Sequence, residues 1–195
     1  MASVVIYAFG DVSGAQFNPC VTFGLFITKR LSVRKWLLFT AAQCLGVLCT
    51  SLMITWFFND PQHDVTAVLR CVPREGVSMW RLFFMEFALS FIVLYVICAT
   101  AFERKDLSTV KVFKTEGITV HTNQGYSKAG FAPLAIGFTL GFLGFVGSDV
   151  SAAYNPARVF GTAIVTGAWD AHWIYWLADY LGAAAGAWCQ KVFIF

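Results

Sequence analysis

Two asparagine–proline pairs are the residues of this sequence whose types and surroundings best suit a chemical role. Asn18-Pro19 and Asn155-Pro156 each stand between a stretch of small residues and an apolar run. Asn suits the N-cap of a helix, and Pro suits the first helical position, where its missing N–H is not needed. Each pair therefore predicts a helix start that presents a side-chain amide and free backbone N–H groups.

The two pairs lie in matching frames. Residues 14–24 and 151–161 share the order small, small, any, aromatic, Asn, Pro, small, any, any, Phe, Gly. The apolar runs that follow, 21–27 and 159–165, are too short to cross a bilayer core of about 30 Å. Each pair is therefore expected to begin a half-helix that re-enters a membrane, with the preceding loop exposing carbonyl oxygens to a wet pore. Paired interrupted segments of this kind are typical of a transport site near the midplane.

The composition favours a multi-pass membrane protein. Of the 195 residues, 58% are hydrophobic and 13% are charged, the net charge is +3 and the mean hydropathy is +0.66. Soluble domains carry about 25% charged residues, so a soluble enzyme, a disordered chain and a nucleic-acid-binding protein are excluded. The six cysteines have no C-x-x-C spacing and are expected as small core residues. Acidic residues lack His or Cys partners at ligand or triad spacing, so the sequence predicts no enzyme, no metal site and no cofactor.

Apolar runs and basic residues together predict a topology. Four runs are credible membrane spans: 36–58, 82–102, 131–147 and 173–195. Lysines and arginines cluster before the first of these and between the second and third, which places those connections in the cytoplasm. The two asparagine–proline copies then enter from opposite sides, as an inverted repeat. The long polar segment 103–130 is expected to be a flexible cytoplasmic loop, either a simple solvated connection or a gate.

The sequence resembles the aquaporin (major intrinsic protein) family. The boxes 13–22 and 155–161 look like its two signature boxes, and the likeness extends to 41–46, 132–137, 172–176 and Glu86. This resemblance implies a single channel domain of the all-α membrane class, with an inverted repeat, two re-entrant half-helices and a homotetramer holding one pore per subunit.

Compared with that family, the chain starts late. The first spanning helix and part of the second have no counterpart, which we expect to reflect truncation of the recorded sequence, with a degenerate family member as the alternative. By this comparison residues 1–58 form an incomplete first repeat, 59–80 an extracellular connection and 81–195 a second repeat that includes the loop 103–130.

The resemblance also implies the site residues. The pore constriction maps to Asn18, Pro19, Cys20, Asn155, Pro156 and Ala157, with Cys20 in place of the usual Ala. The selectivity filter maps to Arg158, Ala152 and Leu143, with Gly144 as the alternative to Leu143. The carbonyl loops contain Gly14, Ala15, Gln16, Ser151 and Ala153. Glu86 and Gln43 are expected as scaffold residues, and Glu86 is expected to hydrogen-bond a half-helix loop. The sequence offers no explanation for Asp179, which stands where relatives often have Pro.

These residues predict a passive channel for water that excludes protons and ions. No His occupies the second filter position, and Leu143 with Ala152 indicates a wider, less polar filter that favours glycerol, urea or ammonia. Val159, Ala163 and the pair Tyr175-Trp176 are instead typical of water-selective members. Water is therefore the favoured solute, and a broader channel and a non-conducting structural protein are the alternatives. The membrane of residence stays undetermined. Because Ala152 replaces a cysteine that makes some relatives sensitive to mercury, block by mercurials at this position is expected to be absent.

Overall fold

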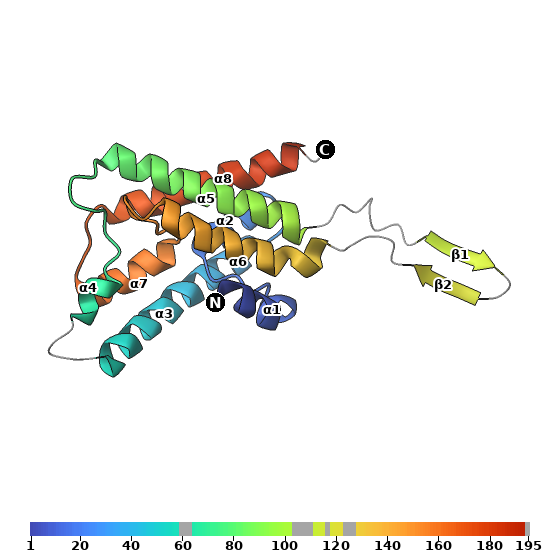
Figure 1. Cartoon of the computed structure of the whole chain (residues 1–195), viewed down its shortest axis with the longest axis horizontal. Helices are drawn as coiled ribbons and strands as arrows, with labels where there is room; N and C mark the ends of the chain where they lie inside the picture. Colours follow the sequence, from blue (N-terminus) through green and yellow to red (C-terminus); the bar gives the residue numbers. More distant parts are fainter. Residues whose placement is uncertain (59–63, 103–110, 116–117, 123–127, 194–195) are drawn as a thin grey trace.

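The structure is a computed structural model that describes residues 1–58, 64–102, 111–115, 118–122 and 128–193. These residues form eight helices and one two-stranded hairpin (Figure 1). The first half of the chain holds α1 (Ala2–Ser13), the half-helix α2 (Pro19–Ile27) and α3 (Val33–Phe57). The second half holds α4 (Val65–Leu69), α5 (Met79–Ala101), β1 (Lys111–Thr115), β2 (Ile118–Thr122), α6 (Lys128–Val146), the half-helix α7 (Pro156–Thr166) and α8 (His172–Phe193).

The helices follow one another along the chain as two related sets of three. In each set a half-helix stands between two longer helices, giving α1–α2–α3 and α6–α7–α8. The sets interlock, because α2 packs on α8, α7 packs on α3, α1 packs on α6, and the two half-helices touch. This exchange of partners is what an inverted repeat requires, since each half-helix is held by the other half of the molecule.

Helix α5 fixes the second set. It packs most extensively against α8 and also against α6 (Figure 1). The approach of α5 and α8 is close because Gly182 and Gly186 face the backbone carbonyls of Phe87 and Phe91, where a Cβ would collide. Small residues on α8 therefore permit the close crossing with α5. In α6, by contrast, Gly141 meets open space.

The helical surface is apolar. Large hydrophobic side chains are more than half exposed on several helices, among them Trp56, Trp80, Phe84, Phe138 and Phe145. Soluble monomers rarely expose apolar patches of this extent, whereas a lipid-facing surface requires them. Of the four predicted spans, α3 and α5 have both the length and the hydropathy to cross a membrane. The other two, α6 and α8, fall short, because the apolar stretch of α6 is shorter and α8 carries polar residues.

Two expectations need correction. The segment 103–130 contains the antiparallel strands β1 and β2, in the register that pairs Lys111 with Thr122. It is therefore not wholly irregular; its Val, Ile and Thr residues are β-branched and favour strands. The cysteines are not uniformly core residues either. Cys20, Cys71 and Cys98 are buried, but Cys49 is exposed on the apolar outer surface of α3, and all six are free thiols.

Candidate functional site

The starts of the two half-helices have the predicted capping geometry. In α2 the Oδ1 of Asn18 accepts a hydrogen bond from the Cys20 N–H at 3.0 Å. In α7 the Oδ1 of Asn155 accepts from the N–H groups of Ala157 at 3.1 Å and Arg158 at 3.4 Å. Pro19 and Pro156 occupy the first helical positions. The sequence prediction of two half-helices that begin at these asparagines is confirmed.

The amides of the two asparagines cross between the two halves. The Nδ2 of Asn18 donates to the Tyr154 carbonyl at 2.7 Å. The Nδ2 of Asn155 donates to the Phe17 carbonyl at 3.1 Å. Tyr154 and Phe17 are the residues immediately before the two asparagines, so each cap binds the chain that leads into the other cap. One N–H of each amide is used in this way.

The crossed bonds hold the positive ends of two helix dipoles face to face. Each helix N-terminus carries roughly half an elementary charge, concentrated on N–H groups without intrahelical partners. Two such ends that point at one place repel cations and align a neutral molecule that accepts hydrogen bonds. The geometry therefore brings two positive helix ends and two side-chain amides to one place.

The loops before the half-helices share one unusual backbone feature. Ala15 and Ala152 occupy equivalent positions in the repeat, and both have left-handed backbone, with φ of 46° and 58°. Tyr154 has φ of 31°. Non-glycine residues in this region are sparsely populated, and they persist only where their surroundings hold them. The shared turn indicates that the two loops are shaped for a common purpose.

Glu86 holds the second of these loops. Its side chain is fully buried in α5. Its Oε1 accepts from the Ala153 N–H at 2.9 Å and its Oε2 accepts from the Tyr154 N–H at 2.6 Å. These are the contacts that the resemblance predicts for this residue. The carboxyl group satisfies two N–H groups that would otherwise be buried without partners, and so fixes the left-handed turn.

The first loop has lighter support. The Nε2 of Gln43, from α3, donates to the Gln16 carbonyl at 2.8 Å. The Ala15 N–H donates to the Ser13 hydroxyl at 3.2 Å. The Oε1 atoms of Gln43 and Gln16 are buried without a hydrogen-bond partner. Gln43 thus occupies the scaffold position expected from the resemblance, with a single bond to the loop.

Arg158, in the first turn of α7, lies beside the second loop. It is exposed, and its Nη1 donates to the Ala152 carbonyl at 2.9 Å. This bond fixes the guanidinium beside the loop and offsets the cost of a cation near a helix N-terminus. The remaining N–H groups of the guanidinium are free to donate to a solute.

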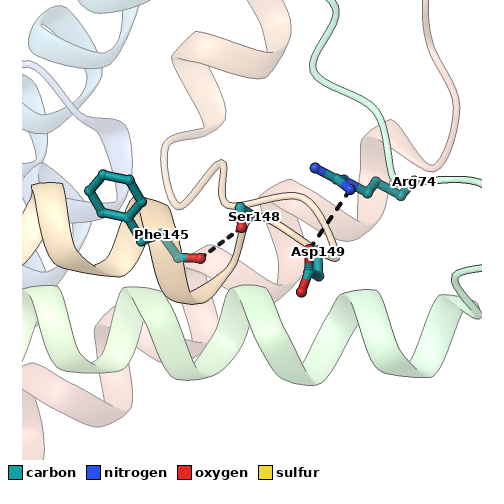
Figure 2. A network of polar contacts seen from close by, with 4 residues as sticks. All are labelled: Arg74, Phe145, Ser148 and Asp149. Atoms are coloured by element: carbon teal, nitrogen blue, oxygen red, sulfur yellow. Dashed lines mark hydrogen bonds and ion pairs between the residues drawn. The ribbon is translucent and has the colours of Figure 1, made fainter.

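The outer side of this loop is tied to the connection before α5. Figure 2 shows the ion pair between Arg74 and Asp149, with Nη1 and Oδ1 3.8 Å apart, and the hydrogen bond from the Ser148 hydroxyl to the Phe145 carbonyl at 2.8 Å. The Arg74 N–H also donates to the Val150 carbonyl at 3.0 Å. The backbone contact anchors the entry to the loop, while the exposed ion pair adds little.

A cavity of about 600 Å³ lies on one side of Asn18. Its lining includes the first loop from Gly14 to Asn18 together with residues of α1, α2, α5 and α6. The predicted exposure of this loop to a hollow is therefore what the structure shows. The second loop, which contains Ser151 and Ala153, does not line this cavity. Ser151 instead donates its hydroxyl to the Tyr175 hydroxyl at 2.7 Å.

Several predicted site residues lie behind the pore-facing surfaces. Cys20 and Ala157 are fully buried, so their small side chains let the half-helices approach and line no open conduit. Leu143 is 3% exposed and packs in an apolar cluster with Leu89 and Ala152. Gly144, the alternative filter position, is partly exposed and lies near the Tyr154 hydroxyl. The Leu143 side chain packs in a cluster with Leu89 of α5, and it is therefore not exposed at the expected filter position.

Two contributors to the site had no predicted role. Tyr154 accepts the Asn18 amide through its carbonyl and donates its own hydroxyl to the Leu140 carbonyl at 2.9 Å. Asp179 is fully buried, with its Oδ1 bonded to the Ser90 hydroxyl at 2.8 Å. The aromatic position of the repeat was a signal for Tyr154. An acidic residue inside a predicted span was a signal for Asp179.

Comparison with known proteins identifies the family of the chain. The family model described as "Major intrinsic protein" matches residues 1–190. The chain belongs to the major intrinsic protein family. Among curated members of that family, Aquaporin-B of Dictyostelium discoideum is 44% identical over 98% of this chain and 68% of its own length. The probable aquaporin TIP1-2 of Oryza sativa subsp. japonica is 33% identical over 96% of this chain and 66% of its own length.

A solved structure has the same fold as this chain. The aquaglyceroporin of Plasmodium falciparum superimposes with a TM-score of 0.73, at 19% identity, over 96% of this chain and 76% of that chain. The chain spans about two thirds of the length of the two curated relatives. As a member of the family it is an integral membrane protein of the channel class and not an enzyme.

Proposed function

We propose that this protein is a passive channel for water, open in part to other small neutral solutes. The observation that carries the proposal is the reciprocal pair of bonds from Asn18 to the Tyr154 carbonyl and from Asn155 to the Phe17 carbonyl. It brings two helix N-termini together with two amide donors beside a cavity, which is an arrangement that favours neutral hydrogen-bonding molecules over cations. The curated relatives named aquaporin support the same class of function.

Within this proposal the filter rests on Arg158 and Ala152. The exposed guanidinium donates to the Ala152 carbonyl and keeps further donors free, so it repels cations and orients an entering solute. Leu143 is buried, and therefore the second filter position falls to the partly exposed Gly144. A glycine there widens the filter, and this feature favours passage of glycerol or urea beside water as the second candidate.

The test is transport by the reconstituted protein. Proteoliposomes are exposed to gradients of sucrose, glycerol and urea, and volume is followed by stopped-flow light scattering, while an enclosed pH dye reports proton entry. Fast water flux without proton entry is expected. The substitution Arg158→Ala should admit protons and raise glycerol flux, and Arg81→Ala, at an exposed position on α5, is the matched control. Water flux no faster than that of empty liposomes would refute the channel and leave a structural role.

The proposal also includes the domain organisation and the oligomeric state. We infer one channel domain over residues 1–195, with 1–58 as the first repeat, 59–80 as an outer connection and 81–195 as the second repeat. Homotetramers in a lipid bilayer fit the apolar outer faces of α3, α5 and α6. Chemical cross-linking of the protein in liposomes tests the oligomer, and a species no larger than a monomer would contradict it.

A further inference from the structure

A second buried carboxyl group lies behind the half-helix loop. Asp179, on α8, is fully buried beside α5. Its Oδ1 accepts from the Ser90 hydroxyl at 2.8 Å, and among the described residues its Oδ2 meets no hydrogen-bond donor. Ser90 stands four residues after Glu86 on α5, so its bond to Asp179 places the Asp179 carboxyl group on the same face of α5 as the Glu86 carboxyl group. Two acidic side chains from facing helices therefore share one dry site.

The hydrogen bonds at this site decide which acid is ionised. Both oxygens of Glu86 accept backbone N–H groups of the second loop, from Ala153 and Tyr154. A carboxylate offers acceptors only, and this is the form that suits Glu86. Asp179 has one oxygen with a donor and one without, so the only way to fill the second is for Oδ2 to carry a proton of its own. Two adjacent buried carboxylates repel each other strongly in the low-dielectric interior, so only one of the two is charged.

The neighbouring charges agree with this assignment. Around Asp179, α5 contributes Glu86, α2 contributes the Cys20 thiol, α8 contributes the Tyr175 phenol, and Cys71 lies on the connection before α5. None of these groups is a cation. The positive charge that reaches the pair is Arg158, which acts on Glu86. An ionised Asp179 would therefore have no compensating charge in the part of the chain that the structure describes.

We propose that Asp179 is a protonated positioning residue whose Oδ2–H donates to the Glu86 carboxylate and so holds the half-helix loop at Ala153 and Tyr154. The loop is then the end of a chain of contacts that runs from the Ser90 hydroxyl to Asp179, to Glu86 and to the loop amides. Tyr154 closes the chain, since its carbonyl receives the Asn18 amide. This inference rests on the proposed channel only for its consequence on flux; the proton itself is measured separately.

The proton is observed by infrared spectroscopy of the protein in liposomes. A protonated buried carboxyl has a C=O stretch distinct from that of a carboxylate, and it shifts in heavy water. This band is expected in the parent protein and is expected to vanish in Asp179→Asn. The matched control is Asp149→Asn, at the exposed loop position, which should leave the band in place. A parent protein without the band, or a band that survives Asp179→Asn, would overturn the proposal.

The positioning role is observed by amide hydrogen exchange. In Asp179→Asn the side-chain amide can donate to Glu86 and accept from Ser90, so exchange at Ala153 and Tyr154 should stay within about twofold of the parent. Asp179→Leu removes the donor, and the same amides should exchange about tenfold faster, with a matching loss of water flux. Unchanged exchange in Asp179→Leu would overturn the role. If Asp179→Leu does not fold, the Asn variant still decides, since faster exchange in it contradicts rescue. If the band and the exchange behave as stated but the parent conducts no water, the proposed function fails and this inference stands.

Discussion

The two half-helix loops share a left-handed alanine, at Ala15 and Ala152, but different side chains hold them in place. The second loop is held at Ala153 and Tyr154 by both oxygens of a buried carboxylate from α5. The first loop is held at Gln16 by one amide hydrogen bond from α3, and it borders the cavity. The difference shows that the second loop is a rigid part of the core, whereas the first is a lining element with polar atoms left over.

The packing of the long helices explains this difference. In the second set α5 lies against α8 so closely that Gly182 faces backbone. In the first set α3 packs on the half-helices α2 and α7, but the described residues place no full-length helix against its other face, where Gly46 meets open space and borders a shallow apolar groove. A buried carboxylate needs neighbours on all sides, and only the second set supplies them. The following substitutions test this contrast, from the largest expected effect to the smallest.

Replacement of Glu86 should have the largest effect. Glu86→Leu leaves the N–H groups of Ala153 and Tyr154 buried without acceptors, which costs about 2–6 kcal/mol at 1–3 kcal/mol each. The protein should lose water flux and unfold at much lower temperature in detergent, as measured by thermal unfolding of the purified protein. Glu86→Gln keeps one acceptor oxygen and should fall between the parent and the leucine variant. Equal stability of all three would show that the second loop does not depend on α5.

Introducing a side chain between α5 and α8 should come next. Gly182→Val forces methyl groups into the Phe87 carbonyl, and overpacking of this kind costs about 1–3 kcal/mol. Gly46→Val is the matched control in the first set, because nothing lies within 4 Å of a Cβ there. Thermal unfolding should separate the two variants clearly. Equal loss in both would mean that α3 is as tightly covered as α8.

Removing the crossed amides should lower the free energy of unfolding by less, but it should abolish water flux. Asn18→Ala and Asn155→Ala each lose a cap, worth about 1 kcal/mol, and a bond between the halves, worth about another 1 kcal/mol. Asn18 is 3% exposed and Asn155 is partly exposed, so water replaces the lost partner more readily at Asn155. Asn18→Ala should therefore be the more destabilised variant in thermal unfolding. Greater loss in Asn155→Ala would reverse the assignment of the rigid and the lining half.

The sequence predicted the symmetric parts of this site better than the asymmetric ones. Capping chemistry is local, so the half-helix starts at Asn18 and Asn155 could be predicted from adjacent residues. The contact between Glu86 and the second loop followed from the family resemblance. The burial of Leu143 and the pairing of Asp179 with Glu86 depend on how α5, α6 and α8 face one another, which no local pattern specifies. The strands within 103–130 were missed because their β-branched residues are interspersed with lysines and a histidine, in a segment that otherwise looks like a polar loop.

Replacement of Gln43 should have a small effect. Gln43→Leu removes one bond to the Gln16 carbonyl, but it also removes an Oε1 that is buried without a partner. The two changes oppose each other, so the net cost should be about 0–1 kcal/mol. Thermal unfolding measures it, with Thr50→Val, at an exposed position of α3, as the control. A loss as large as that of Glu86→Leu would abolish the contrast between the loops.

The smallest change in stability is expected at Ala152, where a single sulfur atom is added. Ala152 lies in the second loop, its carbonyl accepts the Arg158 guanidinium, and it carries no thiol. Because a mercurial attaches to a thiolate, Ala152→Cys should gain a block of water flux by mercurial reagents that the parent lacks, while thermal unfolding stays unchanged. The nearby buried Cys71 calls for a control, so Cys71→Ser is combined with Ala152→Cys. The block should persist in the double variant, since the new thiol stands beside the Arg158 contact. A variant that lacks all six native cysteines serves as a further test. Full block of its water flux by mercurials would show that flux is controlled elsewhere than at the second loop.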